Sequence, residues 1–129
     1  MSHGVDATVA TLTEGTTPEI SATLVDLAGV AVPGSVLDSL VLTYYQEYTQ
    51  AIINARNAQN VLQANGVTVG ADGKLVWGLS LADTVIVNDA LETEPHIANF
   101  TFTYPDGAET KVGSLTLRIP IANIYRDAA

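Results

Sequence analysis

The strongest constraint on the fold is the segment 74–79, KLVWGL, in which apolar side chains recur at every second position. Its two leucines and the chain's one tryptophan, Trp77, fall on the same side of an extended backbone, because successive side chains of a strand point to opposite faces. Asp72-Gly73 before the segment and Ala82-Asp83 after it are turn signals. The segment therefore predicts a strand that points Trp77 into a hydrophobic core.

The same period of two recurs along the chain, with glycine, proline and asparagine between the runs. Strands are predicted at 5–13, 19–26, 37–48, 52–53, 67–69, 74–79, 97–104 and 109–121. A helical turn is expected at 60–62, an acidic loop at 88–95, and a sheet edge near Pro120, which has no amide hydrogen. Seven to eight short strands in one domain, 1–129, predict an all-β fold, an immunoglobulin-like antiparallel β-sandwich.

Composition narrows the classes of function. The chain has 129 residues, no cysteine, 15% charged residues and 47% apolar residues, so neither a disulfide nor a thiolate zinc site can form and the surface carries few charges. The net charge of −9 disfavours nucleic-acid binding, because phosphates would be repelled. With neither a signal peptide nor an apolar run of membrane-spanning length, we expect no membrane partner and synthesis in the cytoplasm.

Candidates for chemistry are few. Glu92, Glu94 and His96 would share one face of an extended chain, and carboxylates with imidazole can hold zinc, which would suit a metal-dependent enzyme. Pro95 and the acidic surroundings instead favour a solvated turn, or a histidine paired with Glu94. His3 is expected to be a bystander near the terminus. We therefore expect no metal, no cofactor and no enzymatic activity.

Three other polar groups carry weaker signals. Asp83, Asn88 and Asp89 lie close in sequence but lack the spacing of a calcium loop, so capping and turn formation are favoured. Tyr44, Tyr48 and the segment 54–60, with Asn54 and Asn57, could bind a carbohydrate or a receptor. Core packing and local hydrogen bonds are the plainer interpretation of the same residues.

Three segments, read together, resemble one group of proteins. They are IINARNAQNVLQANGV at 52–67, GKLVWGLSLADTVIV at 73–87 and EPHIANFTFTY at 94–104. Their order and gaps are similar to those of small immunoglobulin-like structural proteins of tailed bacteriophages. Where that group has glycine after the asparagine of its Ile-Asn-Gly-Arg-Asn-like element, this chain has Ala55. Whether a left-handed backbone is kept at Ala55 is therefore open.

The resemblance implies a place in the virion, reached from the cytoplasm of a bacterial host. It implies a capsid decoration or neck/tail accessory protein, whose partners are capsid or neck/tail subunits and further copies of itself. Segments 1–13 and 120–129 are candidate interaction arms. The first, with Val5, Val9 and Leu12, could pair with a neighbour's strand, and the second could place Ile121, Ile124 and Tyr125 in an apolar groove.

Overall fold

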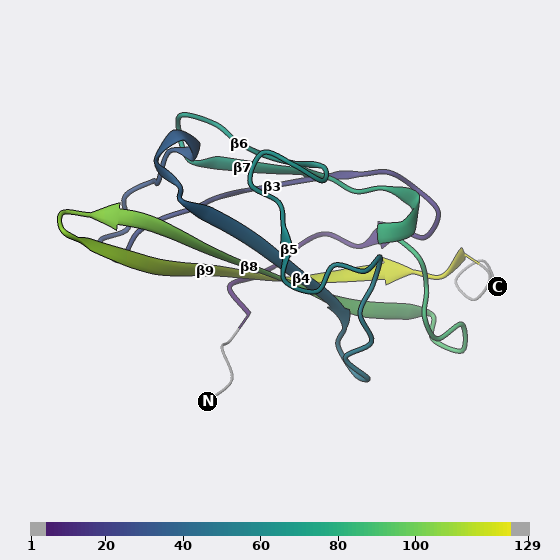
Figure 1. Cartoon of the computed structure of the whole chain (residues 1–129). Helices are drawn as coiled ribbons and strands as arrows, with labels where there is room; N and C mark the ends of the chain where they lie inside the picture. Colours follow the sequence, from purple (N-terminus) through teal and green to yellow (C-terminus); the bar gives the residue numbers. More distant parts are fainter. Residues whose placement is uncertain (1–4, 125–129) are drawn as a thin grey trace.

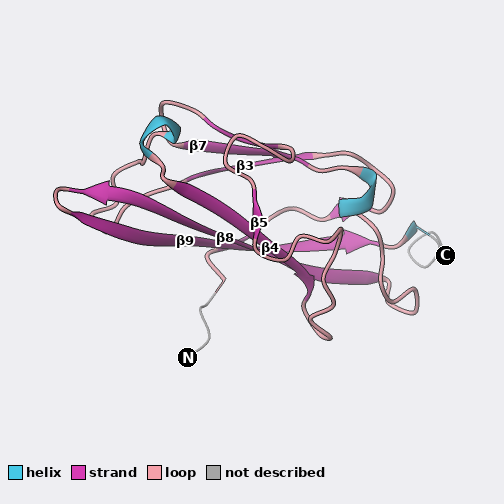
Figure 2. Cartoon of the chain, in the orientation of Figure 1, coloured by secondary structure: helices cyan, strands magenta, loops and turns pink. Residues whose placement is uncertain are grey.

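The computed structural model describes residues 5–124 as two β-sheets that lie one above the other (Figure 1). Within that range there are nine strands and two short 3-10 turns, joined by loops (Figure 2). The strands are β1 (Ala7–Thr8), β2 (Leu12–Thr13), β3 (Glu19–Thr23), β4 (Ser39–Gln46), β5 (Gln59–Asn60), β6 (Val67–Val69), β7 (Lys74–Gly78), β8 (Thr93–Asp106) and β9 (Glu109–Ala122). The turns are η1 (Gly34–Val36) and η2 (Leu81–Asp83). The predicted all-β sandwich is confirmed at this level.

One sheet is larger than the other. Its strands follow the order β1-β9-β8-β4-β5, with β2 also on β9, and the smaller sheet has the order β3-β7-β6. All pairs are antiparallel except β1 and β2, which run parallel to β9. The expectation of a wholly antiparallel sandwich is therefore wrong for the N-terminal strands.

The core lies between the sheets and is centred on Trp77. Its ring makes edge-to-face contacts with Tyr44 at 5.1 Å and Phe100 at 5.7 Å between ring centroids. Leu75 and Leu79 are buried on either side of it, as the period of two predicts. The alternate residues of β8 that the sequence assigns to the core, Ala98, Phe100, Phe102 and Tyr104, are buried as well.

The predicted strand 5–13 is broken into β1 and β2. Thr8 is opposite Arg118 and Leu12 is opposite Ile121. The three residues between Thr8 and Leu12 therefore lie opposite only two residues of β9, those between Arg118 and Ile121. This one-residue bulge lies beside Pro120, which has no amide hydrogen to donate. Pro120 thus interrupts pairing within the sheet, and the prediction that it marks a sheet edge is wrong.

Two local predictions in the middle of the chain have different outcomes. The bridge between Tyr45 and Ile52 confirms an extended chain at Ile52. The helical turn predicted for 60–62 is wrong, because Gln59–Asn60 forms β5 on β4 and Val61 N donates to Leu40 O. Among residues 5–124, no helix has the length and apolar character needed to cross a bilayer.

Candidate functional site

The predicted metal-binding group is split by the fold. Glu94 and His96 lie on β8 and are fully buried, with Glu94 Oε1 2.6 Å from His96 Nε2, whereas Glu92 is exposed. Glu94 also accepts hydrogen bonds from Val87 N at 2.8 Å and Asn88 N at 2.7 Å. The expected solvated acidic turn is therefore wrong here, and the alternative pairing of His96 with Glu94 is confirmed.

This arrangement makes a closed structural cluster rather than a ligand set. In the part of the chain that the structure describes, no three histidine, cysteine or acidic residues are placed to hold a metal ion. The remaining ring nitrogen of His96, Nδ1, lies 2.9 Å from the Tyr44 hydroxyl. Burial lowers the pKa of His96, an effect that Glu94 opposes, and hydrogen bonds hold the pKa of Glu94 below its usual range.

A second buried cluster joins Arg56 to Asp83. The guanidinium donates from Nε to Oδ1 at 2.7 Å and from Nη2 to Oδ2 at 3.0 Å, and it lies 5.4 Å from the Trp77 ring centroid. Asp83 also accepts from Asn54 Nδ2 at 2.9 Å and forms a capping box with Ser80 on η2. The capping role favoured for Asp83 over calcium binding is thus confirmed. Its partner Arg56 was not predicted from the sequence as part of any site.

Tyr44 connects the two clusters. Its hydroxyl donates to the Asp83 carbonyl oxygen at 2.8 Å and contacts His96 on the other side. Burial raises the pKa of Tyr44, so the phenol keeps its proton at any ordinary pH. Because Tyr44 is fully buried, it cannot take part in the predicted carbohydrate site, and that assignment is wrong.

The segment around Arg56 has an unusual backbone. Among residues 5–124, six residues other than glycine have positive φ angles, all between positions 50 and 65: Gln50, Asn54, Ala55, Ala58, Gln63 and Asn65. Ala55 has φ of 54°, so this position has the left-handed conformation although it is not a glycine. Such strain persists where surrounding contacts hold it, and beside Ala55 the bond from Asn54 Nδ2 to Asp83 Oδ1 supplies one of them.

One side of the larger sheet, formed by β4, β8 and β9, faces away from the core. We call it the β4–β8–β9 face and define it by four rows across the three strands. The rows are Ser39, Thr103 and Val112; Val41, Thr101 and Ser114; Thr43, Asn99 and Thr116; and Tyr45, Ile97 and Arg118. Only Arg118 carries a charge, and it donates to both carboxylate oxygens of Glu47 at 2.8 and 3.1 Å.

Polar side chains on this face bond to one another. Ser39 Oγ lies 2.6 Å from Thr103 Oγ1, and Asn99 Nδ2 donates to Thr116 Oγ1 at 2.7 Å. Thr101 Oγ1 donates to Asn99 Oδ1 at 3.0 Å. Because these groups already have partners, covering the face with another surface would cost less desolvation energy than covering unpaired hydroxyls.

One end of the face carries larger side chains. Two shallow depressions meet at Tyr45 and Gln50; one continues to Ile52, and the other, of about 340 Å³, to Val5 and Arg118. The predicted contact residue Tyr48 lies in the hairpin that follows β4 and is 68% exposed. Val5 is partly exposed and Tyr48 is exposed, and their role as interaction residues stays a prediction.

The other predicted interaction residues are distributed unevenly. Val9 and Leu12 pack against the core, and the strand that holds Leu12 is already paired with β9. Ile121 is fully buried in the core, so the prediction that it fills a partner's groove is wrong. Asn54, Asn57 and Ile124 are exposed, and Tyr125 lies outside the described residues.

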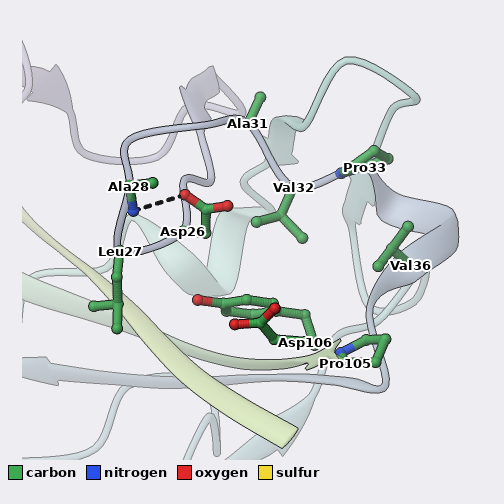
Figure 3. A pocket seen from close by; sticks show the side chains of 10 residues that line it. Asp26, Leu27, Ala28, Ala31, Val32, Pro33, Val36, Pro105 and Asp106 are labelled. Carbon is green, nitrogen blue, oxygen red and sulfur yellow. Dashed lines mark hydrogen bonds between the residues drawn. The ribbon is translucent and has the colours of Figure 1, made fainter. Parts of the chain in front are cut away.

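A further pocket lies near the tip of the β8–β9 hairpin. It has a volume of about 390 Å³ and is bounded by the loop 26–36 and by Tyr104, Pro105 and Asp106 (Figure 3). One residue that lines the pocket, Asp26, already has hydrogen-bond partners, because its Oδ1 accepts from Ala28 N and Val30 N, both at 2.9 Å. Leu27 is 85% exposed beside it. None of these groups was singled out from the sequence.

The comparisons with known proteins add no assignment. No protein family matches the chain, and no curated protein matches its sequence.

Proposed function

We propose that the chain is a non-enzymatic structural component of a tailed-phage virion, which binds neighbouring virion subunits through the β4–β8–β9 face. The sequence resemblance of segments 52–67, 73–87 and 94–104 suggests the class of protein. The docking role rests on one observation. The outer face of the larger sheet is nearly uncharged, although the chain as a whole has a net charge of −9. On such a chain, a neutral surface is where contact with another acidic subunit meets least repulsion.

The strand arrangement supports an immunoglobulin-like type of sandwich. A short N-terminal strand parallel to the last strand, followed by the order β9-β8-β4-β5, lies against β3-β7-β6. Immunoglobulin-like domains likewise divide seven to nine strands between two sheets. We assign the chain to this type as part of the same proposal.

Burial of the ionisable clusters supports a structural role for them. Glu94, His96 and Asp83 are fully buried, so a substrate in solution does not reach them in this conformation. Arg56 is 4% exposed and lines an open depression of about 320 Å³ with Asn54 and Ser80. Tyr45 and Arg118 on the accessible face are instead residue types enriched at protein–protein interfaces. These two residue types and the low charge of the β4–β8–β9 face support a docking role for it.

Particle fractionation tests the proposal. Density-gradient fractions of phage particles from the source culture are probed with an antibody against the chain, and the chain is expected in the particle band. Thr101→Arg, at the centre of the face, should remove it from the particles. Thr68→Arg, on the exposed outer side of β6, makes the same charge change in the smaller sheet and should leave it in place. A native chain that stays with soluble protein contradicts the proposal.

Carbohydrate or receptor binding is the second candidate. The observation in its favour is the 68% exposure of Tyr48, together with exposed Asn54 and Asn57. Aromatic rings at exposed positions can stack on sugar rings. A glycan array should then give hits that Tyr48→Ala abolishes, and an array without hits removes this candidate.

A further inference from the structure

The sheet edges of this molecule differ in how they are covered. Along the far side of β9, the larger sheet is covered by β1 and β2. On the outer edge of β6, the side-chain amide of Gln63 donates to Val69 O at 2.9 Å and accepts from Val69 N at 3.1 Å. On β5, Asn65 Nδ2 donates to Asn60 O at 2.7 Å. The edges at β5 and β6 thus have main-chain groups partly occupied by side chains, which limits strand addition there.

The edge formed by β3 is different. Leu24 N donates to Gly73 O and Leu79 N donates to Pro18 O, so the even-numbered positions direct their main chain toward β7. The main-chain groups of Glu19, Ser21 and Thr23 consequently point away from the sheet. Within residues 5–124, β3 pairs with β7 alone, and no main-chain or side-chain partner lies on its other side.

We propose that β3 pairs with β3 of a second copy of this chain, antiparallel and about a two-fold axis at Ser21. The two smaller sheets then form one continuous sheet of six strands. In this register Ser21 faces Ser21, and Glu19 faces Thr23 of the other copy, so all five residues of β3 are paired. The inference stands apart from the proposed virion role, because it rests on the main-chain geometry and charge of β3.

Charge complementarity favours a second copy over an unrelated strand. Within one chain, Thr23 is opposite Lys74 on β7, and both are exposed on the outer side of the smaller sheet. Glu19 of the second copy would lie beyond Thr23 in the same row, two strands or about 10 Å from the backbone of Lys74. Two long side chains can close that gap, and the two-fold axis creates the Glu19–Lys74 pair twice. If the register between the two copies shifted so that Glu19 of one lay opposite Ser21 of the other, Glu19 would lie in the row of Val76 instead of the row of Lys74.

Cysteine cross-linking tests the register, because the native chain has no cysteine. Two Ser21→Cys chains would place their Cα atoms about 5.5 Å apart, within disulfide range. Under mild oxidation we expect a disulfide-linked dimer from Ser21→Cys and little from Thr68→Cys, an equally exposed position on β6. A mixture of Glu19→Cys and Thr23→Cys chains should cross-link more than either alone. Equal yields for Ser21→Cys and Thr68→Cys overturn the proposal.

Charge reversal tests the pairing in the native assembly. In sedimentation equilibrium, Glu19→Lys or Lys74→Glu should weaken dimerisation roughly tenfold, since each change affects two exposed pairs. The double variant, which restores opposite charges, should recover most of that loss. A native chain that remains monomeric at every concentration, as expected if β3 accepts a strand of another protein, overturns the proposal. So does a dimer whose dissociation constant none of these variants changes.

Discussion

The Arg56–Asp83 and Glu94–His96 clusters are both buried between the sheets, and both contact Tyr44, yet they are built differently. Arg56 and Asp83 form a two-bond ion pair that holds η2 against the left-handed segment, and the hydrogen bonds from Arg56, Ser80 and Asn54 keep the pKa of Asp83 below its usual range despite burial. Glu94 accepts hydrogen bonds from the amides of Val87 and Asn88, and burial lowers the pKa of its partner His96. We therefore expect acid to affect the Glu94–His96 cluster before it affects the Arg56–Asp83 cluster.

Removing Asp83 should give the largest effect. Asp83→Ala leaves the Arg56 guanidinium buried without its carboxylate and also removes the capping box of η2. We expect a loss of about 3–5 kcal/mol in the free energy of unfolding, measured by urea denaturation. Asp38→Ala, at an exposed position, is the control and should change stability little. An equal loss for both variants would show that the Arg56–Asp83 pair contributes no more to the free energy of unfolding than an exposed aspartate does.

Glu94→Gln should have a smaller effect. The replacement keeps the shape of the side chain but turns one acceptor into a donor. The Glu94 carboxylate accepts from three donors, Val87 N, Asn88 N and Gln46 Nε2, so the new amide group of the glutamine would face a donor. We expect a loss of about 1–3 kcal/mol in the free energy of unfolding. Glu92→Gln, at an exposed site, should be neutral. Unchanged stability of Glu94→Gln would mean that the loop 87–92 does not depend on this carboxylate.

The pH dependence sharpens the contrast between the clusters. The folded-state pKa of His96 is lowered by burial, so the unfolded chain takes up a proton first as pH falls below about 6.5. Stability should therefore be level above that pH and decline below it. A second decline should follow at lower pH, as Glu94 and Asp83, whose pKa values are also lowered, become protonated.

Denaturation curves at a series of pH values, with NMR titration of the imidazole, measure this dependence. His3→Gln is the control, because it removes the other histidine and should leave the first decline unchanged. A stability that rises as pH falls through 7 would mean that His96 is held as an imidazolium by Glu94 and has a raised pKa.

The smallest effect is expected at Ala55, beside the Arg56–Asp83 cluster. At φ of 54° an alanine is strained, and Ala55→Gly relieves that strain while adding freedom to the unfolded chain. We expect a net gain of up to about 1 kcal/mol, from thermal or urea unfolding. Ala64→Gly, whose φ is not positive, should instead cost about 0.4–1 kcal/mol. A loss of equal size at both positions would contradict the strain at Ala55.

The candidate site was only partly predictable. Glu94 and His96 stood out as a spaced acid and imidazole, and their mutual pairing was one of two interpretations. Arg56 was not singled out, because Asp83 lies 27 positions away and no local pattern links them. The one available signal was that both residues fall within segments 52–67 and 73–87, on which the expected resemblance rests. The β3 edge was equally hidden, since open edges depend on which strands become neighbours.

The sequence by itself determined where most of the strands lie and which side of each faces the core. The period of two in β7 and β8 is a local property, and it places Trp77 and Phe100 inward whatever the neighbouring strands are. Only the tertiary structure decided that β1 runs parallel to β9, that Glu94 is buried, and that Asn65 and Gln63 cap two edges while β3 stays open. These features depend on contacts between distant segments, whose geometry exists only after the sheets have formed.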